Sequence, residues 1–224
     1  IRRPPRSTLD RSSAASDVYK RQGTYALVTG DMLLYGPGKT GEMSVFKSNR
    51  KDQLASFKGN QMIVTPKVSY LLSDKSLAAL DRSRYLELHE KREALKASKG
   101  KISGQLKKLG KNASSPTGKK LRTELGRLNL EIDKFSVAMK KCFKWQVASD
   151  YPLSMILTRD RVFAGGKGKI AAFDTRTGKI TWKKTVRANA YGLAAASGRL
   201  YVSTDDGSIY SSQAPGEGAK EARQ

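Results

Sequence analysis

Short apolar runs, broken by Gly, Asp, Asn, Lys and Pro, occupy two parts of the chain, residues 23–82 and 144–212. Many short strands at spacings of about 8–12 residues are typical of all-β sandwiches, barrels and propellers. The pattern predicts strands at 25–28, 32–35, 42–46, 62–65, 69–73, 76–80, 144–147, 154–158, 161–165, 170–173, 179–186, 192–195, 200–203 and 208–210.

Residues 83–143 follow a different period. Apolar residues recur there at alternating spacings of four and three, which is typical of a helix packed along a second helix. The later arm carries Leu121, Leu125, Leu128, Ile132, Phe135 and Met139. The earlier arm carries Tyr85, Leu88, Leu95, Ile102, Leu106 and Leu109, with Arg92 and Lys99 at the two positions between. Segment 110–118 has Gly at both ends and Pro116 inside, so we predict an antiparallel α-helical coiled-coil hairpin.

An internal repeat is clearest over residues 161–182, which predict a strand, a Gly turn, a strand, a second turn and a strand with Trp182. Asp174 opens the second turn, where its carboxylate can accept hydrogen bonds from following amides. Gly178 closes this turn and can adopt a positive φ without steric cost. Trp182 offers a large surface that can cover a neighbouring sheet.

Further copies of the repeat lie on both sides of this unit. Residues 198–210 hold Asp206-Gly207 between two apolar runs, which is a strong hairpin signal. Residues 68–82 end at Asp81 and Arg82 without the expected Trp-bearing strand. A matching strand with Trp145 follows the helical segment, so we predict that the hairpin is inserted into one blade between Arg82 and Phe143.

The strings VFAGGKGKIAAFDTRTGKITW and RLYVSTDDGSIY resemble the pyrroloquinoline-quinone-like (PQQ-like) β-propeller repeat family. The resemblance implies an all-β fold of propeller blades, and the repeats amount to part of a propeller, about three to four blades of the usual 4–8. It also implies structural roles in turns and blade packing for Asp81, Trp145, Asp174, Gly178, Trp182, Asp206 and Gly207.

The family name suggests a quinone cofactor, but this chain lacks the residues for one. Related quinone-dependent dehydrogenases cover the quinone with adjacent cysteines, and Cys142 is the single cysteine here. We therefore expect no PQQ, no metal site and no catalytic set. His89 is the single histidine, and we expect it to be a solvated residue on a helix face.

Charge changes the interpretation mainly in the hairpin. The chain has 43 Lys+Arg and 20 Asp+Glu, a net charge of +23, and residues 83–143 hold 16 basic and 6 acidic side chains. A basic arm of this kind could contact nucleic acid, an acidic protein or an anionic lipid, or could simply be solvated. The candidate anion-contact residues at its tip are Lys107, Lys108, Lys111, Lys119 and Lys120.

The two ends of the sequence do not resemble folded protein. Residues 1–22 resemble a translated sequencing adapter, with a native basic arm as the alternative, so we expect the native N-terminus to be missing. Residues 213–224 are predicted to be a disordered tail. No segment has the roughly 20 apolar residues of a transmembrane helix. The compartment stays open, although similar propellers are commonly periplasmic or exported.

These observations favour a non-catalytic PQQ-like repeat scaffold that mediates protein interaction. One alternative is the propeller region of a larger enzyme, either a quinoprotein-like oxidoreductase or a methyltransferase fusion. The other alternative is anion or nucleic-acid binding through the basic hairpin.

Overall fold

The computed structural model describes residues 26–29, 32–37, 42–47, 53–110 and 114–213. The chain divides into two compact units, residues 1–58 and 59–224. The expectations for residues 1–22, for residues 214–224 and for Lys111 lie outside the described residues.

The first unit contains one antiparallel sheet with the strand order β1-β2-β3-β4. Its strands are β1 (Ala26–Thr29), β2 (Met32–Tyr35), β3 (Glu42–Lys47) and β4 (Gln53–Lys58). Met43 and Val45 of β3 and Ala55 and Phe57 of β4 are buried, as the two-residue period of a strand requires. The sequence pattern does not predict β4, because small and polar residues dominate it, and its pairing with β3 supplies what the local sequence lacks.

The second unit begins with an antiparallel sheet in the order β5-β6-β7-β8. Its strands are β5 (Gln61–Val64), β6 (Val68–Leu72), β7 (Ser76–Asp81) and β8 (Phe143–Ala148). Pairing between β7 and β8 places Ala79 opposite Trp145 and Leu80 opposite Phe143. Both helices of the described residues lie between these two strands in the sequence, so the sheet is continuous across a long helical segment.

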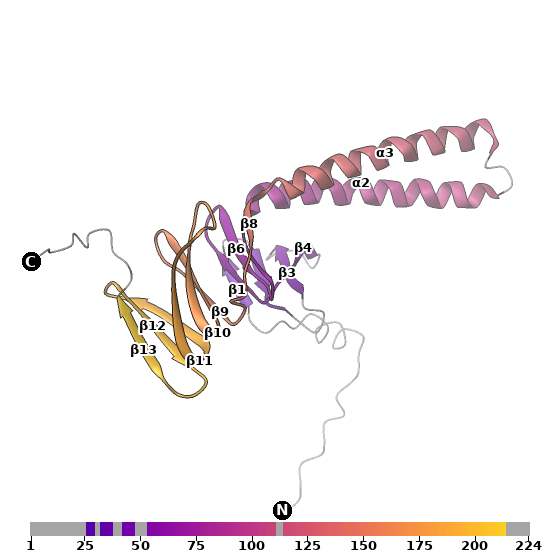
Figure 1. The fold of residues 1–224 in the computed structure, drawn as a ribbon. Coiled ribbons are helices and arrows are strands. Elements are labelled where there is room, and N and C mark those ends of the chain that lie inside the picture. Colours follow the sequence, from indigo (N-terminus) through magenta and orange to yellow (C-terminus); the bar gives the residue numbers. More distant parts are fainter. Residues whose placement is uncertain (1–25, 30–31, 38–41, 48–52, 111–113, 214–224) are drawn as a thin grey trace, which may run out of the picture. The chain divides into compact units, whose positions relative to one another are not determined.

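The helices α2 (Arg82–Leu109) and α3 (Pro116–Lys140) contact each other along their length and form what we call the helical arm (Figure 1). The Ser115 hydroxyl accepts a hydrogen bond from the Gly118 amide at 3.2 Å, and Pro116 occupies the first turn, as helix starts favour. Every α2 position predicted to face the second helix is partly buried, Arg92 and Lys99 included. Over the described residues, neither helix carries the apolar length that a membrane span requires.

The third sheet is antiparallel and has the order β13-β12-β11-β10-β9. Its strands are β9 (Ser154–Leu157), β10 (Arg161–Asp174), β11 (Ile180–Ala196), β12 (Arg199–Thr204) and β13 (Ile209–Gln213). The two longest strands, β10 and β11, each pair with two neighbouring strands. The first part of β10 pairs with β9 and its second part with β11, whereas the end of β11 pairs with β12.

The glycines of β10 make a bulge in place of the turn predicted between two strands. Strand structure runs without a break from Arg161 to Asp174. Gly168 has a φ of 68°, and the register with β11 shifts between Lys167 and Lys169. A bulge bends a strand without ending it, so the Gly-rich segment changes the register and not the element.

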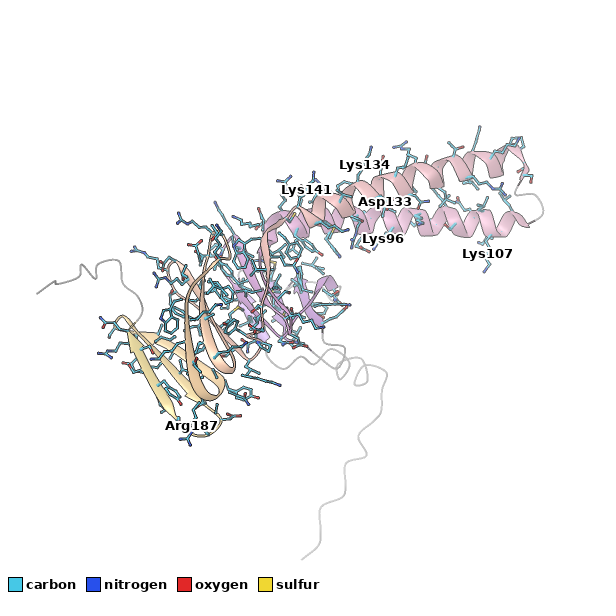
Figure 2. All side chains as sticks on the ribbon, in the orientation of Figure 1. Lys96, Lys107, Asp133, Lys134, Lys141 and Arg187 are labelled. Carbon is cyan, nitrogen blue, oxygen red and sulfur yellow. The ribbon has the colours of Figure 1, made fainter. Side chains whose placement is uncertain are left out.

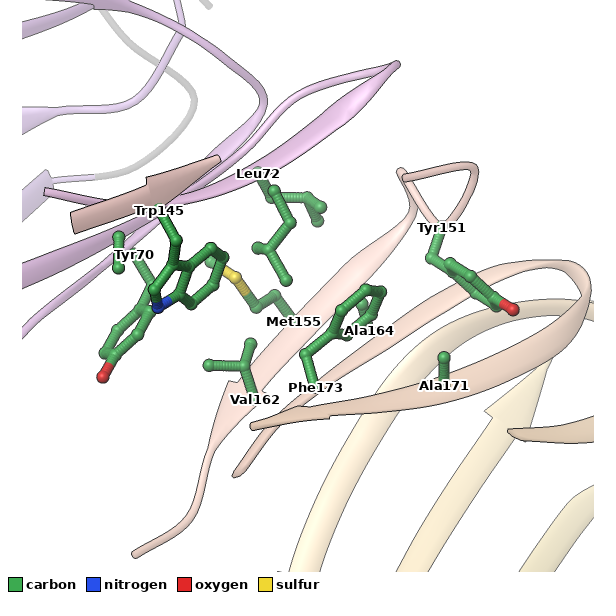
Figure 3. Close-up of a cluster of buried hydrophobic side chains, with 11 residues drawn as sticks. Tyr70, Leu72, Trp145, Tyr151, Met155, Val162, Ala164, Ala171 and Phe173 are labelled. Atoms are coloured by element: carbon green, nitrogen blue, oxygen red, sulfur yellow. The ribbon is translucent and has the colours of Figure 1, made fainter. Parts of the chain in front are cut away.

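The sheets of the second unit share a hydrophobic cluster (Figure 3). Apolar side chains of β6, β7 and β8 meet side chains of β9, β10 and the loop before β9 there. The buried members are Tyr70, Leu72, Leu77, Ala79, Trp145, Tyr151, Met155, Val162, Ala164, Ala171 and Phe173. Burial of such side chains is the main favourable contribution to folding, so this cluster joins the two sheets.

Candidate functional site

Trp145 connects β8 to the turn that follows β10. Its indole Nε1 donates a hydrogen bond to the Thr175 carbonyl oxygen at 2.9 Å, and only 9 % of the residue is exposed. The ring lies directly against Gly178, where an added Cβ would fall 2.6 Å from Cε3 of Trp145. The Tyr70 ring also packs against the indole, with ring centroids 6.1 Å apart. Trp145 therefore fixes one sheet to a turn of the next.

The turn that receives Trp145 is organised by Asp174. Its carboxylate accepts hydrogen bonds from the amides of Arg176 and Thr177, at 3.1 and 2.8 Å, and from the Thr177 hydroxyl at 2.9 Å. The bonds from Thr177 hold the pKa of Asp174 below its usual value, because they favour the ionised form. Gly178 ends the turn with a φ of 70°. The Asp174 carboxylate and Gly178 therefore stabilise the backbone conformation of this turn.

Asp81 occupies the corresponding repeat position at the end of β7, but a helix follows it. Its carboxylate accepts a hydrogen bond from the Arg84 amide at 3.2 Å and so caps the start of α2. In both copies of the repeat, the aspartate carboxylate accepts a hydrogen bond from the amide three residues later. The same residue type thus begins a tight turn at Asp174 and the helical arm at Asp81.

Asp206 and Gly207 form the turn between β12 and β13. The Asp206 carboxylate accepts hydrogen bonds from the Thr204 hydroxyl at 2.6 Å and from the Ser208 amide at 3.1 Å. The bond from Thr204 contributes most to lowering the pKa of Asp206. Gly207 has a φ of 81°, and its missing Cβ faces open space. This turn is therefore built like the one at Asp174, but no tryptophan packs against its glycine.

Trp182 has a different setting from Trp145. It is half-buried and packs edge-on against Phe163, with ring centroids 6.3 Å apart. Within the described part of the chain its indole nitrogen makes no hydrogen bond. The seven repeat residues thus serve turns and packing in the structure, and their assignment as a repeat signature stays a prediction.

The described residues include potential metal ligands and one cysteine thiol. No group of three or more His, Cys, Asp or Glu is placed to hold a metal ion there. Cys142 is buried at the base of the arm, and burial raises the pKa of its thiol.

The prediction of a solvated His89 is wrong. Its side chain is 15 % exposed, and its ring stacks on Tyr85 with centroids 6.2 Å apart. Burial lowers the pKa of His89 despite the Glu93 carboxylate 3.8 Å away. The helix period alone would have placed His89 next to Tyr85, four residues earlier, but the sequence gives no measure of how far the ring is covered.

The basic tip residues of the arm are exposed. Lys107 and Lys108 lie in the last turn of α2, and Lys119 and Lys120 near the start of α3. None of these four makes an ion pair with another described residue, whereas nearer the sheet Lys91 pairs with Glu87 at 2.6 Å. Figure 2 shows Lys107 toward the tip and Lys96, a partner of Glu93, closer to the sheet. Positive charge therefore becomes less compensated toward the tip.

Arg82 is a buried cation that the sequence pattern does not single out. It is 2 % exposed, and its guanidinium donates hydrogen bonds to the Thr65 carbonyl at 2.9 Å and the Ser69 hydroxyl at 3.0 Å. Its Nε has no partner among the described residues, and desolvation lowers the pKa of the guanidinium. Arg82 thus ties the first residue of α2 to the turn between β5 and β6.

A shallow pocket lies at the same base of the arm, between the first turn of α2 and the starts of β6 and β8. It is lined by Lys67, Asp81, Ser83, Arg84, Glu87 and Lys144. Three cations and two carboxylates largely compensate one another, so the pocket carries no strong charge preference.

Comparison with known proteins gives a family match where the repeat is clearest. A family model described as outer membrane protein assembly factor BamB matches residues 136–216. No curated protein sequence matches the chain. The computationally designed Ika4 protein is structurally similar with a TM-score of 0.51 and 8 % identity, over 84 % of this chain and 88 % of that one. At this identity the likeness concerns the fold alone.

Two natural proteins align less closely. BamB from Moraxella catarrhalis gives a TM-score of 0.47 at 13 % identity, over 83 % of this chain and 44 % of that one. Sqt1 from Saccharomyces cerevisiae gives 0.49 at 8 % identity, over 84 % and 44 %. The chain thus spans less than half the length of either structure. The family match over residues 136–216 confirms the resemblance to PQQ-like repeats for that part of the chain.

Proposed function

We propose that this chain is a non-catalytic scaffold of PQQ-like propeller repeats whose helical arm contacts a protein partner. In this proposal the sheets β5–β8 and β9–β13 are blades of a propeller. The arm is an antiparallel coiled coil inserted into one blade between Arg82 and Phe143. No quinone or other cofactor takes part.

The pairing of β7 with β8, which closes the sheet below the arm, carries this proposal. Because Asp81 donates its amide hydrogen to the Cys142 carbonyl oxygen at 2.9 Å, the two strands are joined at the very base of the arm. The sheet therefore does not use the arm to complete its own hydrogen bonds. Two helices of 28 and 25 residues instead expose a long charged surface, and such a surface can steer and select a partner that carries the complementary charge.

A photo-crosslinking experiment tests the proposal. A benzoylphenylalanine placed at the exposed Gln105 of α2 is expected to give a protein adduct in cells of the source organism, sensitive to protease and not to nuclease. The same group at the exposed Ser211 of β13 is the matched control. The proposal would be contradicted if no protein adduct forms at position 105. It would also be contradicted if the same adducts form at positions 105 and 211.

A variant without the arm provides a second test. Replacing residues 83–141 by Asn-Gly keeps Arg82 and leaves a three-residue loop that ends in Gly between Asp81 and Cys142, a loop length that hairpins favour. The variant is expected to unfold cooperatively and to lose the partner. If it keeps the partner, the arm is not the contact element.

Anion binding through the arm tip is a second candidate, favoured by the unpaired exposed lysines there. Changing Lys107, Lys108, Lys119 and Lys120 to Glu would then weaken retention on heparin or RNA at raised salt. Retention unchanged by these four substitutions would exclude this candidate.

A further inference from the structure

The outward face of α3 carries apolar and basic residues in strict alternation. Arg127, Leu130, Lys134, Val137 and Lys141 follow one another at spacings of three, four, three and four. Residues at these spacings lie above one another on one face of a helix, and Lys141, the C-cap, still has helical backbone angles. We call these five residues the outer stripe.

The two apolar members of the outer stripe are strongly exposed. Leu130 is 66 % and Val137 54 % exposed, whereas Leu128 and Met139 of the same helix are 5 % and 3 % exposed. Since a helix turns by about 100° per residue, Leu130 and Val137 lie on the side opposite the buried pair. A single exposed apolar residue needs no explanation, but two of them in line on a charged helix offer an apolar stripe that a partner can cover.

The charges around the outer stripe are mainly positive. Arg127 pairs with Glu131 at 3.4 Å, but Lys134 and Lys141 make no ion pair with a described residue (Figure 2). Asp133 is the other nearby carboxylate and lies on the flank of the stripe. Toward the tip the surplus grows, because no acidic residue lies between Glu93 and Glu124. The arm therefore lacks the acidic groups that would match its own cations.

We propose that the outer stripe binds an acidic amphipathic helix of a partner protein, added alongside α3 as a further helix of the coiled coil. A partner helix with apolar residues at spacings of three and four can cover Leu130 and Val137. Acidic residues flanking its apolar positions meet Lys134 and Lys141. A nucleic acid backbone offers phosphates for the cations but no apolar stripe for Leu130 and Val137. The inference rests on the proposed function and names the class of partner.

Peptide binding to the full chain tests this inference. The probe is a fluorescent 21-residue peptide with Leu at heptad positions a and d and Glu at the flanking positions. A peptide of the same composition in scrambled order and poly-Glu are the controls for charge without amphipathicity. The amphipathic peptide is expected to bind at least tenfold more tightly than either control.

Two pairs of variants locate the surface. Leu130→Gln with Val137→Gln should weaken binding at least tenfold, while Asn129→Gln, exposed on the same helix, should leave it within twofold. Lys134→Glu with Lys141→Glu should also weaken it at least tenfold. Lys107→Glu with Lys108→Glu makes the same charge change on α2, away from the stripe, and should have less than a threefold effect. Circular dichroism at 222 nm checks that each variant keeps its helices. If Leu130→Gln with Val137→Gln lowers helicity, Leu130→Ala with Val137→Ala is used instead.

Three outcomes would overturn the inference. They are equal binding of the scrambled peptide, equal weakening by the two charge-reversal pairs, and tighter binding of heparin or double-stranded RNA than of any peptide. If the peptide does not bind but the adduct at position 105 forms, the partner is of another class and the proposed function stands. If neither occurs, the proposed function itself is wrong.

Discussion

The indole of Trp145 occupies the space that a side chain at Gly178 would need. Carbon Cε3 of the ring lies 2.6 Å from the position of a Cβ on Gly178, and the indole nitrogen bonds the carbonyl of Thr175 in the same turn. The glycine is thus required twice, once for its φ of 70° and once for the close approach of a ring from the neighbouring sheet.

Gly178→Ala should therefore cost more stability than Gly207→Ala. Both residues have a positive φ, which costs roughly 1–2 kcal/mol for Ala in each case. Overlap with Trp145 adds about 1–3 kcal/mol at position 178, whereas position 207 faces open space. Urea unfolding followed by circular dichroism measures both losses. Equal losses of stability in the two variants would show that the Trp145 ring can move aside without a loss of stability.

Trp145→Phe should lower the free energy of unfolding by about 1–2 kcal/mol, because the Thr175 carbonyl loses its donor and the ring loses contact area. Trp182→Phe is the matched control, since Trp182 makes no hydrogen bond in the described part of the chain. The control should lose less than half as much. A larger loss at position 182 would contradict the connecting role given to Trp145.

Arg82→Met should destabilise the second unit by about 1–3 kcal/mol, since the Thr65 carbonyl and the Ser69 hydroxyl lose a buried donor. Arg84→Met, an exposed arginine two residues later, should change stability by less than about 0.5 kcal/mol. Thermal unfolding of the two variants side by side provides the comparison. If they melt together, the buried guanidinium contributes nothing net.

Asp174→Asn should remove part of the pH dependence of stability. Because Thr177 lowers the pKa of folded Asp174, the carboxylate stabilises the fold above the ordinary Asp pKa of about 3.9. That contribution is lost as the pH falls from there through the lower folded pKa. The variant should therefore be less stable than the wild type at pH 7, and the difference should shrink toward pH 2. Unfolding series at several pH values check this.

Trp145→Phe serves as the control for the pH series. It changes no titratable group, so its stability loss should be the same at each pH. A difference between Asp174→Asn and wild type that stays constant down to pH 2 would show that the charge of Asp174 is irrelevant to the turn.

Local features of this protein follow from the sequence by itself. The 4-3 spacing from Leu121 to Met139 predicts a helix that matches α3, and Asp174 with Gly178 predicts a turn at the place where it occurs. These features depend on interactions among neighbouring residues, which periodicity and turn chemistry express directly. The family match over residues 136–216 confirms the repeat resemblance for the same stretch.

Contacts between segments distant in the sequence were decided only by the tertiary structure. Arg82 and His89 look like exposed residues of a charged helix, and their burial depends on the β5–β6 turn and on how Tyr85 packs. The strand β4 forms by pairing with the free edge of β3. The bulge at Gly168 forms because β10 pairs with β11 on both sides of that glycine. A period along the chain describes which face a residue occupies, but the partner on that face comes from elsewhere in the fold.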